Sequence, residues 1–110
     1  MNDNTWERIL HRIQVQLNAG NLRITQHAQQ EMVEEDISLD DLLETISHGQ
    51  ILEDYPQHRR GACCLLSGRT SAGRAIHLVC TTAQPTLIII TTYEPKLPKW
   101  ITSTRRRQST

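Results

Sequence analysis

Phenylalanine is absent from this chain of 110 residues, and its aromatic residues are two tryptophans and two tyrosines. A chain of this length forms one small domain, so its core must be built largely from aliphatic side chains. Long apolar segments are missing too, because the longest run, Leu87–Ile90, is far too short to cross a bilayer. The first ten residues lack the pattern of a signal peptide. We therefore expect a single cytoplasmic domain.

Cysteine is scarce, and its spacing excludes two common uses. The three residues Cys63, Cys64 and Cys80 are odd in number and contain no Cys-x-x-Cys pair. They form neither a disulfide framework nor a zinc ligand pattern. We predict reduced thiols in the core, and no metal or other cofactor.

Net charge is also absent, since twelve acidic residues balance twelve basic ones. Residues 1–54 hold eleven of the acidic residues and three of the basic ones, and the remainder holds one and nine. A basic half attracts polyanions even in a neutral molecule, and ten of the twelve bases are arginine, whose planar fork suits phosphate. Two interpretations stay open: the basic half binds RNA, or it pairs with the acidic half within the molecule.

The acidic half has the apolar spacing of helices. Residues 5–19 place apolar side chains three and four positions apart, and a second helix follows Thr25 and ends near Asp36. Ser38 begins a third helix, with Asp41 placed to complete a capping box. The basic half instead has short β-branched runs separated by turn residues, which predict antiparallel strands. The expected strands are 51–55, 62–67, 74–82 and 86–94.

These elements predict an α+β fold, with amino-terminal helices packed on one face of a four-stranded antiparallel sheet. We expect one domain over residues 1–100, helical over 1–49 and sheet over 50–94, and a basic flexible tail over 101–110. The sheet face opposite the helices is where a site would lie.

A histidine in the third expected strand is the first candidate for chemistry. Alternation places His77 on the face opposite Ile76 and Leu78, with Arg74 at the start of the strand and Tyr93 at the end of the next. Histidine titrates near neutral pH, so His77 suits proton transfer. A hydrogen-bonded core histidine is the alternative interpretation.

A second histidine, His27, lies in the first turn of the second expected helix, where the helix end favours the neutral ring. Glu31 is one helical turn further along the same face. The two resemble half of a metal site, but no third ligand follows at a suitable spacing. Packing of His27 between helix and sheet is the alternative.

Several short motifs, taken in order, resemble an uncharacterised bacterial domain family often encoded beside YgiT-type zinc-finger antitoxins. The motifs are Thr25-Gln26-His27-Ala28, Met32, Ile37-Ser38, Gly49, Glu53-Asp54-Tyr55, Gly73–Val79, Ile89–Pro95 and Trp100. That family is similar in pattern to the RelE-like toxins and to the wider barnase, EndoU, colicin and RelE ribonuclease group. The resemblance implies a metal-independent RNA endonuclease toxin that is paired with an antitoxin.

The resemblance implies a catalytic set of His77, Arg74, Tyr93 and His27. In such a reaction the 2′-hydroxyl attacks phosphorus, His77 acts as acid or base, Arg74 clamps the phosphate, and Tyr93 positions it or acts as alternative acid. Candidate RNA-binding residues are Arg59, Arg60, Arg69, Lys96 and Lys99.

The sequence departs from the family at one helix. Glu31, Glu35 and Asp36 stand where we expect two arginines and a glycine. A non-catalytic module that binds a protein through its acidic helices or basic sheet is therefore the alternative function. A homodimer that buries Ile88 and Ile90 is a further possibility.

Overall fold

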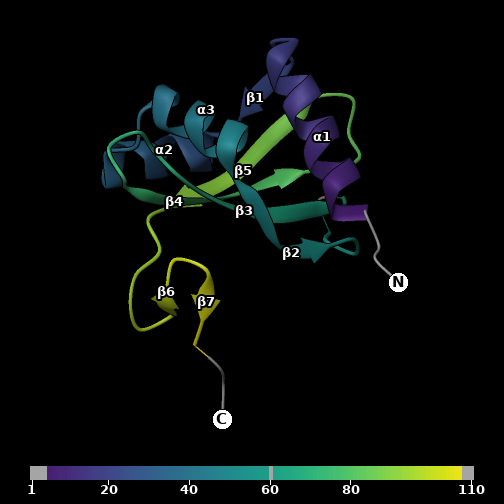
Figure 1. Ribbon diagram of the computed structural model, residues 1–110. Coiled ribbons are helices and arrows are strands. Elements are labelled where there is room, and N and C mark those ends of the chain that lie inside the picture. Colours follow the sequence, from purple (N-terminus) through teal and green to yellow (C-terminus); the bar gives the residue numbers. More distant parts are fainter. Residues whose placement is uncertain (1–4, 60, 108–110) are drawn as a thin grey trace.

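The computed structural model describes residues 5–59 and 61–107, with helices in the first half and strands mainly in the second (Figure 1). The elements are α1 (Thr5–Asn18), β1 (Leu22–Ile24), α2 (Gln26–Glu35), α3 (Leu39–His48), β2 (Gln50–Tyr55), β3 (Cys63–Arg69), β4 (Ala75–Thr81), β5 (Leu87–Tyr93), β6 (Trp100–Thr102) and β7 (Arg105–Arg106). Within these ranges no helix has both the length and the apolar character needed to cross a membrane.

Local side chains define the ends of α2 and α3. The Thr25 hydroxyl accepts a hydrogen bond from the Ala28 N–H at 3.1 Å, and Ser38 forms a reciprocal capping box with Asp41. Both caps satisfy N–H groups that have no partner inside a helix. Helix α2 ends at Asp36, whose φ of 54° is in the left-handed region that favours glycine. These boundaries confirm the sequence prediction for both helices.

The main sheet has five strands in the order β1-β5-β4-β3-β2. Strand β1 runs parallel to β5, and the other neighbours are antiparallel. The α+β class is confirmed, but the prediction of a four-stranded, wholly antiparallel sheet is wrong. The missed strand, Leu22–Ile24, has three residues, too few to establish an alternating pattern, and its partner Leu87–Ile89 is distant in sequence.

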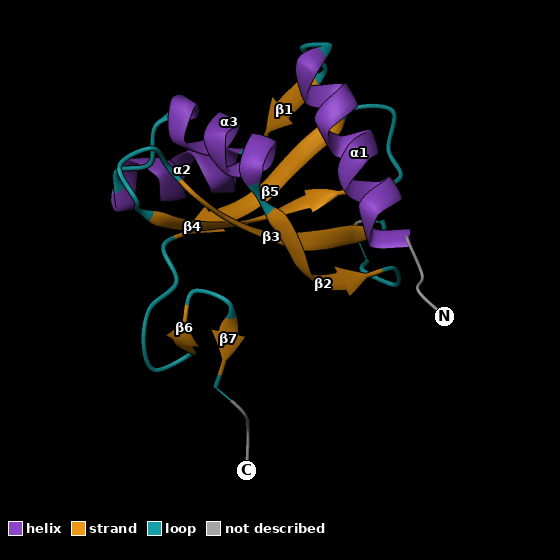
Figure 2. Ribbon diagram, in the orientation of Figure 1, coloured by secondary structure: helices purple, strands orange, loops and turns teal. Residues whose placement is uncertain are grey.

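The sheet separates two layers (Figure 2). The helices cover one face, where Ile76, Leu78 and Cys80 of β4 join the main apolar core. The other face carries the alternate residues of the same strands, and the β6–β7 hairpin lies beside it. This second face holds the candidate site.

A close approach of α3 to β3 depends on Gly68. A Cβ atom at this position would lie 2.7 Å from the carbonyl oxygen of Thr45, which is fully buried in α3. Because any side chain would push the helix away, Gly68 sets the distance between helix and sheet. The same contact brings the end of α3 and the start of β2 beside the end of β3.

The end of the chain contains two short strands that were not predicted from the sequence. Residues expected to begin a flexible tail form the β6–β7 hairpin, and Trp100 is only 3% exposed. Backbone hydrogen bonds from Trp100 to Lys96 and from Arg107 to Lys99 hold the segment together. The last expected tail residues, 108–110, lie outside the described residues.

Candidate functional site

His77 and Tyr93 face each other on adjacent strands of the helix-free sheet face. Their Cα atoms are register partners in the β4–β5 pair, and His77 also pairs with Ser67 of β3. The Nδ1 atom of His77 lies 3.4 Å from the Tyr93 hydroxyl oxygen, and the two ring centroids are 5.3 Å apart. Two of the four predicted catalytic residues are therefore in contact.

The hairpin covers His77 completely. The Nε2 atom of His77 lies 2.5 Å from the carbonyl oxygen of Ser103. The indole of Trp100 packs edge-on against the His77 ring, with a distance of 4.4 Å between ring centroids. A carbonyl oxygen only accepts, so Nε2 donates, and Nδ1 of the neutral ring is left to accept from the Tyr93 hydroxyl. His77 has no exposed surface in this arrangement.

Burial also fixes the protonation states of the pair. Desolvation lowers the pKa of His77, against the opposing effect of the Ser103 carbonyl, and the nearby Arg106 lowers it further. Desolvation raises the pKa of Tyr93. A neutral imidazole therefore lies next to a protonated phenol, which is the state required for a base beside an acid.

A charged cluster anchors the hairpin beside this pair. Arg106 donates two hydrogen bonds to the Glu53 carboxylate, at 2.9 and 2.8 Å, and its guanidinium lies 4.6 Å from the Trp100 ring centroid. The Tyr55 hydroxyl donates to the same carboxylate. The Arg106 hydrogen bond lowers the pKa of Glu53, so this carboxylate is ionised near neutral pH.

Glu53, Tyr55 and Arg106 are not among the site residues selected from the sequence, although Glu53 and Tyr55 belong to one of the short motifs. Arg106 belongs to a terminal basic run, which is normally solvated. The usable signal was Trp100, a large apolar residue just before that run, because it indicates that the segment packs against the domain.

Arg74 lies on the other side of the sheet from His77. Its position before Ile76 and Leu78 places it on the helix side, where it donates to the backbone carbonyls of Glu35 and Asp36 at the end of α2. Its guanidinium also pairs with Glu94 at 3.4 Å. In this structure Arg74 therefore joins α2 to the sheet and does not meet the His77–Tyr93 pair.

His27 is exposed at the start of α2, with 66% of its side chain accessible. Its Nε2 atom lies 3.4 Å from Glu31, whose carboxylate also accepts hydrogen bonds from the Thr91 hydroxyl and the Thr92 N–H. Within the described ranges, no group of three or more His, Cys, Asp or Glu side chains could hold a metal ion. His27 is not brought to the His77–Tyr93 pair by any contact.

Glu31 and Glu35 have a structural role at the exposed edge of β5. The parallel strand β1 pairs only with Leu87–Ile89, so the later N–H groups of β5 need other partners. Glu31 accepts from the Thr92 N–H and Glu35 from the Glu94 N–H, each at 3.0 Å. The acidic residues that replace the expected arginines thus satisfy this edge.

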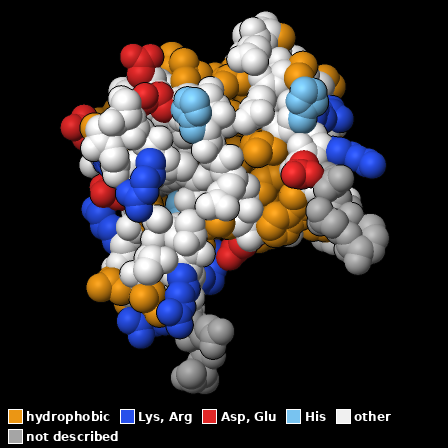
Figure 3. Space-filling model, in the orientation of Figure 1, with side chains coloured by type: hydrophobic (Ala, Val, Ile, Leu, Met, Phe, Trp, Pro, Cys, Tyr) orange, Lys and Arg blue, Asp and Glu red, His pale blue; other side chains and the backbone are white. Residues whose placement is uncertain are grey.

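The candidate RNA-binding side chains are exposed where described. Arg59, Arg69, Lys96 and Lys99 all reach solvent, and Arg60 lies outside the described residues. In Figure 3 the blue side chains gather mainly around the hairpin and the red ones mainly over α2 and α3. Basic side chains thus gather around the hairpin on this face, and further ones lie beside acidic side chains at its left and right edges.

The three thiols are free and buried, as the sequence predicted for the core. Cys64 and Cys80 are register partners under the helices, and Cys63 lies on the opposite face. Burial raises the pKa of Cys63 to about 11, and the contact with Cys64 together with burial raises that of Cys80. Such thiols are poor nucleophiles, so they take no part in the candidate site.

Residues 24–94 match a protein family described as a domain of unknown function, DUF4258. The match covers more than half of the chain. The chain belongs to the DUF4258 family. No curated protein and no solved structure matches the chain. This assignment agrees with the uncharacterised domain expected from the sequence motifs.

The DUF4258 match includes His77, Tyr93 and Glu53 and ends before the hairpin. Ser103 and Trp100, which contact His77, and Arg106, which anchors the hairpin, therefore lie outside the matched DUF4258 range.

Proposed function

We propose that this protein is a metal-independent RNA endonuclease, the toxin of a toxin–antitoxin pair, with its reactive centre at His77 and Tyr93. The observation that carries the proposal is their direct contact across β4 and β5, on the sheet face that the helices leave uncovered. The resemblance to RelE-like toxins supports the choice of RNA as substrate. The basic side chains around the hairpin support it independently.

The protonation states of the pair support transesterification. The RNA 2′-oxygen attacks phosphorus while neutral His77 accepts the 2′-hydroxyl proton. The bond from phosphorus to the 5′-oxygen breaks, and Tyr93 donates a proton to that leaving oxygen. The products are a 2′,3′-cyclic phosphate and a free 5′-hydroxyl, so no metal ion is required to balance the step.

Arg69 is better placed than Arg74 to supply positive charge in this reaction. Its Nη2 group lies 3.4 Å from the Ser103 hydroxyl, on the same residue whose carbonyl accepts from His77. Arg74 is tied to α2 and Glu94 on the far side of the sheet. We therefore assign phosphate binding to Arg69. Arg74 instead anchors helix α2 to the sheet.

The described arrangement is a covered state of this site, because His77 is fully buried. Substrate reaches Nε2 only when the turn at Ser103 moves. Nε2 then accepts the 2′-hydroxyl proton in the ring tautomer that carries its proton on Nδ1, which is open to the ring once the Ser103 carbonyl no longer holds the Nε2 proton. The Glu53–Arg106 pair anchors β7 and does not include the turn residue Ser103.

Cleavage of total RNA by the purified protein in EDTA tests the proposal. We expect cleavage by the wild type, and loss of at least a hundredfold in rate for His77→Ala and Tyr93→Phe. Tyr93→Phe keeps the aromatic packing and removes only the hydroxyl, so it separates chemistry from folding. Intact RNA with the wild type, or cleavage by either variant at the wild-type rate, would overturn the assignment.

A non-catalytic protein-binding module is the second candidate, and one surface favours it. An apolar hollow of about 180 Å³, lined in part by Trp6, Leu10 and Ile51, lies where α1 meets the outer strand β2. Trp6 is 44% exposed there.

Expression in cells distinguishes the two candidate functions. Growth arrest on expression, relieved by a co-expressed antitoxin, supports the toxin. Harmless expression with a stable protein complex supports the module. Sedimentation tests the predicted homodimer.

A further inference from the structure

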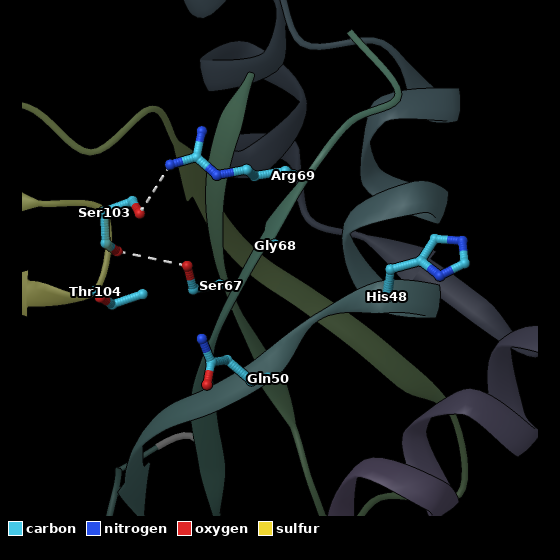
Figure 4. Close-up of a pocket in the computed structure, with 7 residues that line it drawn as sticks. All are labelled: His48, Gln50, Ser67, Gly68, Arg69, Ser103 and Thr104. Atoms are coloured by element: carbon cyan, nitrogen blue, oxygen red, sulfur yellow. Dashed lines mark hydrogen bonds between the residues drawn. The ribbon is translucent and has the colours of Figure 1, made fainter. Parts of the chain in front are cut away.

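A cleft of about 310 Å³ lies beside the turn that covers His77. It is lined by His48, Gln50, Ser67, Gly68, Arg69, Ser103 and Thr104. Figure 4 shows polar side chains from β2, β3 and the hairpin around a shared space, while the His48 ring points to the other side. The volume is at the lower end of small-molecule sites.

The cleft lining is rich in hydrogen-bond donors and contains no carboxylate. Arg69 uses one N–H group on the Gly73 carbonyl and another on the Ser103 hydroxyl, which leaves three of its five donors. The side-chain amide of Gln50 and the side-chain hydroxyl of Thr104 have no hydrogen-bond partner among the residues that the structure describes. These groups match the needs of a phosphate, which carries negative charge and only accepts.

A second hollow nearby differs in charge. It lies between Tyr93 and Trp100 and is lined by Lys96 and Lys99, but also by Glu35 and Glu94. Two carboxylates oppose a bound anion there. The cleft at Arg69 is therefore the better anion site, although it has fewer basic side chains.

We propose that this cleft binds a phosphate group, held by the Arg69 guanidinium with the Gln50 amide and the Thr104 hydroxyl. The bound phosphate takes over the Arg69 donor that now contacts Ser103. Loss of that contact loosens the turn whose carbonyl accepts from His77. One part of this proposal rests on the proposed function: during RNA cleavage the cleft holds the scissile phosphate. Phosphate binding itself does not depend on cleavage.

Phosphate binding is measured by titrating the full chain with inorganic phosphate at constant ionic strength and following the NMR chemical shifts of the backbone amides. We expect saturable shifts at Gly68 and Ser103, and none at Gly20, which lies outside the cleft. Arg69→Gln should weaken binding by about tenfold or more, because it removes charge-assisted hydrogen bonds. Arg8→Gln removes an exposed arginine of α1 that does not line the cleft and serves as the matched control.

Two further probes distinguish the source of the phosphate. Adenosine 5′-monophosphate carries a terminal phosphate, whereas a short oligoribonucleotide with hydroxyl ends carries only backbone phosphates. Tighter binding of either probe, lost in Arg69→Gln and kept in Arg8→Gln, supports the cleft and identifies the source. Absence of saturable shifts with all three probes, or equal weakening by the two variants, would overturn it. If the protein cleaves RNA but binds no phosphate in the cleft, the proposed reactive centre at His77 and Tyr93 stands and only the proposed phosphate site is rejected.

Discussion

The Nε2 atom of His77 lies 2.5 Å from the carbonyl oxygen of Ser103, so the strongest candidate for proton transfer is held by the chain's own hairpin. The same carbonyl oxygen accepts from the Ser67 hydroxyl at 3.4 Å. One backbone group thus joins β3, β4 and the hairpin. Movement of this turn is the step that links the covered site to any reaction at His77.

The first prediction concerns pH. Burial lowers the pKa of His77 in the folded state, so the folded protein binds fewer protons than the unfolded chain as pH falls below about 6.5. Stability from this residue is therefore full above that pH and is lost as pH falls towards the lowered pKa. We expect the free energy of unfolding to fall by up to about 1.4 kcal/mol per pH unit in this window.

Urea unfolding of the wild type and of His77→Gln at pH 7.5 and 5.5 measures the effect. Glutamine keeps an N–H donor but does not titrate, and the other four histidines are common to both proteins. The wild type should lose more stability between the two pH values than the variant. Parallel loss in both would contradict the prediction.

The second prediction concerns the hairpin anchor. Glu53→Gln removes the charge that holds Arg106, and we expect about 1 kcal/mol of lost hairpin stability, because this partly exposed pair is bidentate. Hydrogen exchange of the Trp100 and Arg107 amides, which bond within the hairpin segment, should become several-fold faster. Asp54→Asn removes a neighbouring charge that does not contact Arg106 and should leave these rates unchanged. Equal acceleration in both variants would argue against the anchor.

The third prediction concerns the end of α2. Asp36 has a φ of 54°, which costs a residue with a side chain about 1 kcal/mol relative to glycine. Asp36→Gly should therefore raise the free energy of unfolding by about that amount, while its carbonyl still accepts from Arg74. Asp36→Ala keeps the Cβ atom and should give no gain. Thermal unfolding of the two variants decides between backbone strain and charge removal, since charge removal alone would stabilise both.

The fourth prediction concerns the contact between α3 and β3. Gly68→Ala places a Cβ atom 2.7 Å from the Thr45 carbonyl oxygen, so α3 must move and about 1–3 kcal/mol of stability should be lost. Gly20→Ala has no neighbour within 4 Å of the new atom and should lose only the smaller cost of its positive φ. Similar losses at the two positions would mean that the close approach is unimportant.

The helices and the four long strands follow from local patterns, and the structure explains why the sequence sufficed for them. Thr25, Ser38 and Asp41 act within four residues of the backbone groups that they satisfy. The strand Leu22–Ile24 and the hairpin depend instead on distant partners, β5 and the helix-free sheet face. Short segments whose stability comes from tertiary contacts leave no periodic signal.

The site was predictable only in part, for a similar reason. Alternation placed His77 opposite Ile76 and Leu78, and the structure places it beside Tyr93. Alternation also separates Arg74 from His77 by an odd number of positions, so the two face opposite sides of the sheet. The contacts of Glu53 with Arg106 and of Arg69 with Ser103 join residues far apart in the chain, and no local pattern encodes them.

The most direct test of the central claim is cleavage, in EDTA, of one RNA oligonucleotide prepared with 2′-hydroxyl groups and again with 2′-O-methyl groups. The 2′-oxygen is the nucleophile and His77 accepts its proton, so only the unmodified RNA should be cut. Its products should carry a 2′,3′-cyclic phosphate and a 5′-hydroxyl, and His77→Gln should form them at least a hundredfold more slowly. Failure to cut the unmodified RNA, cleavage of the methylated RNA, or an equal rate with His77→Gln would contradict the claim.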